Sequence, residues 1–306
     1  MSEDHDCSGL PPGLYLVATP IGAARDITLR ALDILRSAAV LAVEDTRRTR
    51  RLLSVHGIQL EGRPLIAYHD HSGSRVRERL LRAARKGASV ALVSDAGTPL
   101  VSDPGYRLVQ AFREVGMPIH QAPGASAVLA ALAVAGQPTD RFLFAGFPPA
   151  RRPARRAFLE DLAGIRASVV VFESPKRIRE TVLDMVDILG PDRPATLCRE
   201  LTKVFEEVIP GTLASLGTLI RDRQSEKPDS VRGEICVVLG PPPDPVAVAD
   251  EEVDRFLRFA LAKLSARDAA SLAAECLGIS KRVTYARALA IGRRIDDAGK
   301  EPGLSE

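Results

Sequence analysis

LVSDAGTPLVSDPGYRLV, residues 92–109, joins an expected strand to an expected helix. It starts in the hydrophobic run SVALVS (89–94), typical of a buried strand, and continues into YRLVQAFREV (106–115), which has the spacing of an amphipathic helix. Strand-to-helix connections usually need about 2–6 residues. This one is longer, holds two Gly and two Pro, and repeats Ser94-Asp95 as Ser102-Asp103. We therefore expect the loop to hold a ligand.

Strands and helices alternate on both sides of this segment. Helices of ordinary length separate the strand candidates, an order that favours parallel βα units. The strand candidates of the first half are LYLVAT (14–19), AVLAV (39–43), PLIAY (64–68), SVALVS (89–94) and PIHQA (118–122). Those of the second half are RFLFAGF (141–147), SVVVFES (168–174), ATLCREL (195–201), KVFEEVIPG (203–211) and RGEICVVLG (232–240). We expect 195–201 and 203–211 to pair antiparallel because so few residues separate them.

The C-terminal part of the chain has a different character. After the Pro-rich linker PPPDPVAVAD (241–250), residues 265–294 contain two apolar-periodic stretches separated by Leu277-Gly278-Ile279-Ser280. This spacing fits a helix-turn-helix, with Gly278 in the turn. An ordinary helical hairpin is the alternative.

Composition restricts the class of protein. The chain has 306 residues, 45% hydrophobic and 26% charged, with a net charge of +3 and arginine clusters at RRTRR (47–51) and RRPARR (151–156). Such clusters suggest contact with an anion such as nucleic acid, although a salt-bridged surface gives the same pattern. The four cysteines are scattered, which favours a reducing cytoplasm, and no apolar run is long enough to span a membrane. The acidic, polar N-terminus, 1–13, is expected to be a disordered lead-in.

Several common sites are not supported. VATPIGAARDIT (17–28) lies where a dinucleotide fingerprint would sit, but it has a single glycine, and the chain has no GxxxxGK[ST] motif. His69-Asp70-His71 has no further histidine nearby, so we expect no metal site. What remains is a group of polar and small-residue loops after the expected strands, where ligands of open α/β sheets bind. These loops are Glu44-Asp45-Thr46, 94–99, 123–127 and Glu173-Ser174-Pro175.

Eight motifs in order then carry a resemblance. They are TPIGAARDITLRAL, EDTRRTRRLL, LVSDAGTPLVSDPGYRLV, PGASAVLAAL, PTDRFLFAGFPP, FESPKRI, RELTKVFEE and RGEI. Together they resemble the ribosomal RNA small subunit 2′-O-methyltransferase I family, part of the tetrapyrrole methylase superfamily. One departure is Ala23-Ala24, where the family often has Asn-Leu.

The resemblance implies an α/β, two-domain tetrapyrrole methylase-like fold with an additional small C-terminal helical domain. The expected organisation is a lead-in (1–13), two α/β methyltransferase domains (14–122 and 123–240), a linker (241–250) and a helical domain (251–306). It also implies a homodimer, with S-adenosylmethionine bound between the two α/β domains. The expected cofactor-binding residues are Pro20, Asp95, Gly97, Thr98, Pro99, Val101, Ser126, Ala127 and Glu173.

The implied reaction is methylation of a ribose hydroxyl of a cytidine in the decoding region of 16S rRNA. A base or a cation near the 2′-hydroxyl would assist it, and chemical type alone makes Asp45, Glu200 and Lys203 candidates. Structural ion pairs are the alternative for all three. The arginine clusters and the expected helix-turn-helix would contact RNA phosphates in free 16S rRNA or the small ribosomal subunit. The residues expected there are Arg47, Arg48, Arg151, Arg152, Arg155, Arg156, Lys281 and Arg282.

Two other readings stay open from the sequence. A porphyrinoid C-methyltransferase of the same superfamily would need neither the arginine clusters nor the extra helices. A non-catalytic RNA-binding assembly factor would keep the fold without turnover.

Overall fold

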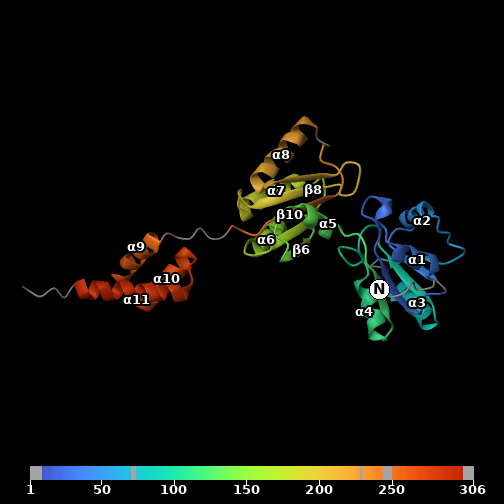
Figure 1. Ribbon diagram of the computed structural model, residues 1–306, viewed down its shortest axis with the longest axis horizontal. Coiled ribbons are helices and arrows are strands. Elements are labelled where there is room, and N and C mark those ends of the chain that lie inside the picture. The colour runs from blue at the N-terminus through green and yellow to red at the C-terminus, as the bar shows by residue number, and fades with distance from the viewer. Residues whose placement is uncertain (1–8, 70–73, 228–229, 244–249, 299–306) are drawn as a thin grey trace, which may run out of the picture. The chain divides into compact units, whose positions relative to one another are not determined.

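The computed structural model describes residues 9–69, 74–227, 230–243 and 250–298, with side chains up to Arg293. The chain divides into two compact units, Met1–Pro242 and Pro243–Glu306. The first unit contains two five-stranded sheets (Figure 1). The expected disordered lead-in and linker lie largely outside the described residues.

The first sheet is parallel throughout, as the alternation of strands and helices predicts. Its strand order is β3-β2-β4-β1-β5. The strands are β1 (Gly13–Val17), β2 (Val40–Val43), β3 (Leu65–Ala67), β4 (Ser89–Val93) and β5 (Ile119–Ala122). The helices are a short 3-10 helix at Ala24–Asp26, α1 (Leu29–Ser37), α2 (Thr46–Val55), α3 (Ser74–Arg85) and α4 (Tyr106–Glu114).

Alternate residues of each strand enter the two cores that lie on either side of this sheet. On β4, Ala91 and Val93 pack with Leu35 of α1 and Leu53 of α2, whereas Leu92 packs on the other face with α3 and α4. The helices therefore cover both faces, and the loops after the strands share one edge of the sheet.

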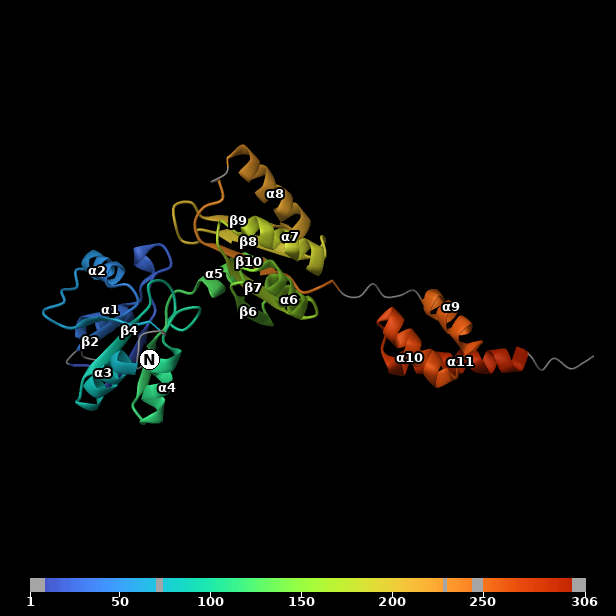
Figure 2. The same ribbon diagram turned by 180° about the vertical axis from the view of Figure 1, so that it is seen from behind.

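The second sheet is mixed, in the order β6-β7-β10-β8-β9, and Figure 2 shows it from behind. Only β6 and β7 are parallel, and the expected antiparallel pairing of β8 with β9 is confirmed. The strands are β6 (Phe142–Gly146), β7 (Ser168–Glu173), β8 (Pro194–Arg199), β9 (Glu207–Thr212) and β10 (Ile235–Leu239). The helices are α5 (Ala127–Val134), α6 (Arg152–Ala163), α7 (Ile178–Leu189) and α8 (Leu213–Glu226).

Helix α8 was not among the elements expected from the sequence. Thr212 caps it in a capping box with Ser215, and Leu213, Leu216 and Ile220 enter the core beside α6 and α7. Helix α5 covers the opposite face of the same sheet, where Val128 and Leu132 pack against Val170 and Val238. The polypeptide thus changes sheets at residues 123–126.

The second unit is helical in its described part. It consists of α9 (Asp250–Leu261), α10 (Ala266–Leu277) and α11 (Lys281–Ala298), which share a small core. Gly278 ends α10 in the left-handed conformation, with φ of 65°, so the expected helix–turn–helix order is confirmed. None of the described helices has the length and hydrophobicity to cross a membrane.

Candidate active site

The loop after β4 is tied to the loop after β1. Thr19 and Gly97 exchange two backbone hydrogen bonds, each 2.9 Å, and the Ser94 hydroxyl donates to the Gly97 carbonyl at 2.6 Å. Gly97 has φ of 78°, a conformation that L-residues with a side chain rarely adopt. These hydrogen bonds and the Gly97 conformation therefore fix the path of the loop.

Further along the loop, Gly105 starts helix α4 with φ of 138°, and a Cβ there would lie 2.6 Å from a methyl carbon of Leu92. Leu100 and Ser102 also have positive φ, at 73° and 61°. Strained backbone of this kind is concentrated at functional sites. The long connection noticed in the sequence is thus a shaped structure between strand and helix.

Asp95 links this loop to the start of α2. Its Oδ1 accepts a hydrogen bond from the Asp45 backbone N–H at 2.9 Å, and its Oδ2 lies 3.6 Å from Nε of Arg48. One carboxylate therefore holds two sheet-edge loops together.

A third carboxylate stands close to Asp95 and Glu44. Burial, together with the charges of Glu44 and Asp95, raises the pKa of Asp103 to about 7. Burial and the Asp95 charge also raise the pKa of Glu44, although His69 and Arg48 oppose them. Oδ2 of Asp103 is buried and has no hydrogen-bond partner among the described residues. This edge of the first sheet is therefore strongly acidic.

The second sheet supplies the opposite wall. Because β10 runs antiparallel to β7, its first residue, Ile235, pairs with Glu173, the last residue of β7. Glu234 and Cys236 therefore come to the same edge as Glu173. Phe147 and Phe172 add aromatic surface, with ring centroids 5.5 Å apart.

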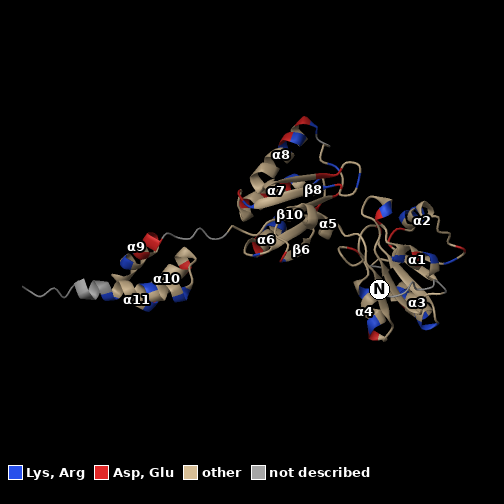
Figure 3. Ribbon diagram, viewed as in Figure 1, with Lys and Arg blue, Asp and Glu red and all other residues tan. Residues whose placement is uncertain are grey.

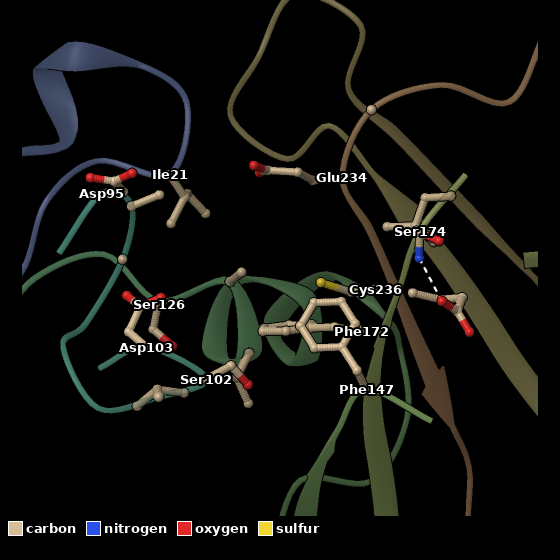
Figure 4. A pocket seen from close by; sticks show the side chains of 18 of the residues that line it. Ile21, Asp95, Ser102, Asp103, Ser126, Phe147, Phe172, Ser174, Glu234 and Cys236 are labelled. Atoms are coloured by element: carbon tan, nitrogen blue, oxygen red, sulfur yellow. Dashed lines mark hydrogen bonds between the residues drawn. The ribbon is translucent and has the colours of Figure 1, made fainter. Parts of the chain in front are cut away.

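Between these walls lies a cavity of about 420 Å³. Figure 4 shows Asp95 and Asp103 on one side of it and Glu234, Cys236 and Phe172 on the other. Its lining residues are Ile21, Glu44, Arg48, Asp95, Ala96, Gly97, Val101, Ser102, Asp103, Ser126, Ala127, Val128, Phe147, Phe172, Glu173, Ser174, Pro175, Gly233, Glu234, Ile235 and Cys236. One acidic wall thus faces a second wall that combines aromatic surface with Glu173 and Glu234.

Most of the residues expected at a cofactor site meet at this cavity. Those that line it are Asp95, Gly97, Val101, Ser126, Ala127 and Glu173. Pro20, Thr98 and Pro99 are not among its described lining residues. The Thr98 hydroxyl instead donates to the Ala125 carbonyl at 3.1 Å, which ties the β4 loop to the start of α5.

Glu173 has a structural task. It is 2% exposed, and Arg177, the Thr181 hydroxyl and the Ser174 backbone N–H all bind its carboxylate, at 2.6, 2.6 and 2.7 Å. These three donors engage both oxygens of the carboxylate, which therefore shapes the 173–175 loop.

The three residues expected to assist catalysis do not reach the described cavity wall. Asp45 is the N-cap of α2, and hydrogen bonds from the Arg47 and Arg48 backbone N–H groups lower its pKa. Glu200 and Lys203 form an ion pair of 2.7 Å. Burial would raise the pKa of Glu200, but the hydrogen bonds from Lys203 and from the Glu234 backbone outweigh it and the pKa is lowered. These groups are held as structural pairs, the alternative that the sequence left open.

The residues expected to contact RNA fall into two groups: side chains that are exposed, and arginines that form ion pairs within the protein. The side chain of Arg47 is 91% exposed, and Arg151, Lys281 and Arg282 are also exposed. Arg48 lies at the cavity with 66% of its side chain exposed.

The prediction for Arg155 is wrong. Its side chain is 2% exposed and contacts Asp184 at 2.8 Å, so it is a buried partner within the α6–α7 packing. The same Asp184 also pairs with Arg152 at 3.1 Å and Arg156 at 3.3 Å, although these two side chains stay 66% and 35% exposed. The cluster RRPARR is therefore in large part a charge network within the protein.

No group of His, Cys, Asp or Glu arranged to hold a metal ion occurs among the described side chains. Asp70 and His71 of the His69-Asp70-His71 segment lie outside the described residues.

Comparison with known proteins gives the family. Residues 13–217 match the Tetrapyrrole (Corrin/Porphyrin) Methylases, and residues 247–292 match the RsmI C-terminal HTH domain. The chain is 47% identical over 282 residues to ribosomal RNA small subunit methyltransferase I of Mesorhizobium japonicum, covering 92% of each chain. It is 40% identical to the protein of the same name from Pseudomonas aeruginosa, covering 90% of this chain and 96% of that one.

Solved structures agree on the fold. A cobalt precorrin-4 methyltransferase matches 74% of this chain and 94% of its own, with a TM-score of 0.55 at 19% identity. A diphthine synthase matches 74% of this chain and 89% of its own, with a TM-score of 0.53 at 17% identity. The two sheets, the sheet-edge cavity and the sequence relatives lead to one conclusion: the chain belongs to the ribosomal RNA small subunit methyltransferase I family, within the tetrapyrrole methylases.

Proposed function

We propose that the chain transfers a methyl group from S-adenosylmethionine to the ribose 2′-oxygen of a cytidine in the decoding region of 16S rRNA. Membership of the family makes it an rRNA methyltransferase. The observation that supports the proposed site is the cavity between the acidic loops of the first sheet and the aromatic wall of the second.

The residues of this cavity fit the cofactor. Phe147 and Phe172 provide apolar surface for a flat base, and Ala96 and Gly97 let a ligand approach the loop closely because neither carries a large side chain. The carboxylates of Asp95 and Asp103 favour a positively charged ligand. Bound S-adenosylmethionine supplies a methyl carbon on a positively charged sulfur that a nucleophilic oxygen can attack.

The protein must then orient the ribose, exclude water and accept a proton from the 2′-hydroxyl. We assign the last role to Asp103 in place of the engaged Asp45 and Glu200. Its Oδ2 has no partner among the described residues, and its pKa of about 7 suits a base at neutral pH. The oxygen forms a bond to the methyl carbon, the carbon–sulfur bond breaks, and the products are a 2′-O-methyl ribose and S-adenosylhomocysteine.

Exposed basic side chains would hold the RNA backbone near the cavity. Arg48 is placed to do so because it lines the cavity while most of its side chain is exposed. Arg47 lies on the same helical turn, and Lys281 and Arg282 begin α11 of the second unit. Arginine and lysine contacts of this kind position RNA without reading its sequence.

The test is methyl transfer from radiolabelled S-adenosylmethionine to small ribosomal subunits that lack the modification, followed by alkaline hydrolysis of the RNA. A 2′-O-methyl group blocks cleavage at its own linkage. We expect label in an alkali-resistant dinucleotide containing cytidine. Label in a mononucleotide, or transfer to a porphyrinoid and none to RNA, would refute the proposal. The absence of transfer despite RNA binding would indicate an assembly factor.

We also propose that the chain acts as a homodimer. Leu129 and Val134 of α5 and Phe142 and Leu143 of the edge strand β6 are large apolar side chains with 36–57% exposure. An exposed apolar surface of this kind is typical of an interface. Sedimentation of wild type and of Leu129→Glu/Phe142→Glu checks this, and a monomeric wild type would contradict it.

A cytoplasmic location follows from the proposed substrate. It is consistent with the free state of the described cysteines, Cys198, Cys236 and Cys276.

A further inference from the structure

Helix α3 carries a concentration of positive charge that the proposed site does not use. Residues 74–86 contain six Lys or Arg and one Glu, a net charge of +5, whereas the whole chain carries +3. The rest of the chain is therefore slightly acidic. Figure 3 colours Lys and Arg blue, and blue segments of the ribbon lie on α3.

Four of these cations form one row, three on a single face of α3 and the fourth, Lys86, directly after the helix ends. Arg75, Arg79, Arg82 and Lys86 follow one another at intervals of four, three and four residues, which returns each to the same side of an α-helix. All four are exposed and line one groove, while the opposite side of α3 buries Leu80 and Ala84 in the core. We call these four residues the α3 basic face.

The α3 basic face is not neutralised by the described part of the protein. No ion pair or side-chain hydrogen bond of these four residues occurs among the described residues, and Glu78 is the single acidic residue beside them in the groove. The arginines of α6 differ, because Asp184 and Asp187 bind them. Uncompensated cations on a rigid helix have no evident structural task and favour an external anion.

The spacing suits a polyanion. Neighbouring side chains of such a row lie about 5–6 Å apart, and the twelve residues from Arg75 to Lys86 extend over about 16 Å. A chain of phosphates presents charges repeatedly along such a length, and guanidinium groups bind phosphate oxygens in pairs. A single small anion would engage only part of the row.

Topology relates α3 to the cavity. Helix α3 follows β3, which is parallel to β2 and in turn to β4, so β3 ends at the sheet edge where Glu44 and Asp95 also stand. The α3 basic face thus starts at the edge of the first sheet that carries the cavity loops and runs away from it.

We infer that the α3 basic face binds the phosphate backbone of the rRNA segment flanking the methylated nucleotide. This inference rests on the proposed function. It adds a docking surface to the arginines expected from the sequence, and it makes the contact electrostatic and independent of base identity.

The test compares two triple variants of equal charge. Arg75→Gln/Arg79→Gln/Arg82→Gln removes three cations of the α3 basic face, and Arg30→Gln/Arg36→Gln/Arg221→Gln removes three exposed arginines of α1 and α8. Binding of 16S rRNA and methylation kinetics are measured from about 50 to about 300 mM salt. For the α3 variant we expect an RNA affinity at least about tenfold weaker and a log–log salt slope shallower by about 2–3. We expect kcat at saturating RNA to be unchanged, and the control to stay within about twofold of wild type.

A third variant, Arg75→Lys/Arg79→Lys/Arg82→Lys, keeps the charge and is expected to retain the wild-type salt slope. Wild-type KM and salt slope in the glutamine variant would refute the inference while leaving the proposed function intact. A defect seen with assembled subunits but not with naked rRNA would also refute it, because α3 would then contact a ribosomal protein. Absence of RNA methylation by the wild type would refute the proposed function itself.

Discussion

Asp103 gives the most direct test of the electrostatics of the cavity. Its pKa of about 7 results from burial and from the charges of Glu44 and Asp95, against an ordinary value of 3.8. Replacing it with Asn keeps the size of the side chain and removes the charge. The substitution therefore measures how much the ionised carboxylate destabilises the folded protein.

The direction of the pH effect on the free energy of unfolding follows from proton binding. Between about pH 4 and about pH 7 the folded protein holds a proton on Asp103 that the unfolded chain has lost. The contribution of Asp103 to the free energy of unfolding therefore falls as pH rises through this window and is constant above it. A pKa difference of this size corresponds to at most about 4 kcal/mol, at 1.36 kcal/mol per pKa unit.

We expect Asp103→Asn to gain about 2–3 kcal/mol relative to wild type on going from about pH 5 to about pH 8. Urea unfolding of both proteins at the two pH values, followed by circular dichroism, measures this difference. Asp222→Asn, at an exposed carboxylate on α8, is the control and is expected to show little change. A gain for Asp103→Asn that does not depend on pH would show that the carboxylate is solvated and would refute the reasoning. The same variant should lose most methyl transfer while still binding cofactor, because its amide cannot accept the proton.

Three further outcomes are expected. Affinity for S-adenosylmethionine should rise between about pH 6 and about pH 8, because ionised Asp103 favours a cation. Affinity for the product S-adenosylhomocysteine, whose sulfur is uncharged, should rise less. Calorimetric titrations measure both affinities, and equal pH profiles would count against this reasoning. Arg155→Met should lower the free energy of unfolding by about 1–3 kcal/mol in urea titrations, because Asp184 loses its buried partner and keeps only Arg152 and Arg156. Arg151→Met, at an exposed position, should change it by less than about 0.5 kcal/mol. Gly105→Ala should destabilise the protein and weaken cofactor binding, since its φ of 138° and the Leu92 contact both oppose a Cβ; a wild-type melting temperature and cofactor affinity would contradict this.

The parallel sheet and the β4 loop could be read from the sequence because their signals are local. Strand and helix patterns alternate at regular spacing, and the loop after Val93 contains more Gly and Pro than a simple turn requires. Glu44 and Asp103 were visible in the same way, the first in the loop after β2 and the second in the repeat of Ser94-Asp95. That Glu44 and not Asp45 lines the cavity needed the structure, because an N-cap and a cavity wall call for the same residue type at adjacent positions.

The sequence contains no comparable local signal for the wall of the cavity that the second sheet supplies. Glu234 and Cys236 reach the cavity only because β10 runs antiparallel to β7, and the direction of a strand within a mixed sheet is not written in its own residues. The error at Arg155 has a related cause. A run of arginines looks the same whether it faces solvent or an aspartate from another helix, and Asp184 lies 29 residues away in the chain.

The contrast between α3 and α6 bears on how this family selects a large substrate. The two sheets are shared with methyltransferases at 19% identity, so the fold alone cannot specify RNA. Substrate selection must therefore depend on features added to the fold. In our proposal these features are the exposed cations of α2 and α3 and those of the first turn of α11 in the second unit. On α6 all three arginines instead form ion pairs with Asp184 of the neighbouring helix. What distinguishes an RNA-binding surface here is thus the absence of acidic partners beside the cations, and the number of arginines in a segment is a poor guide to it.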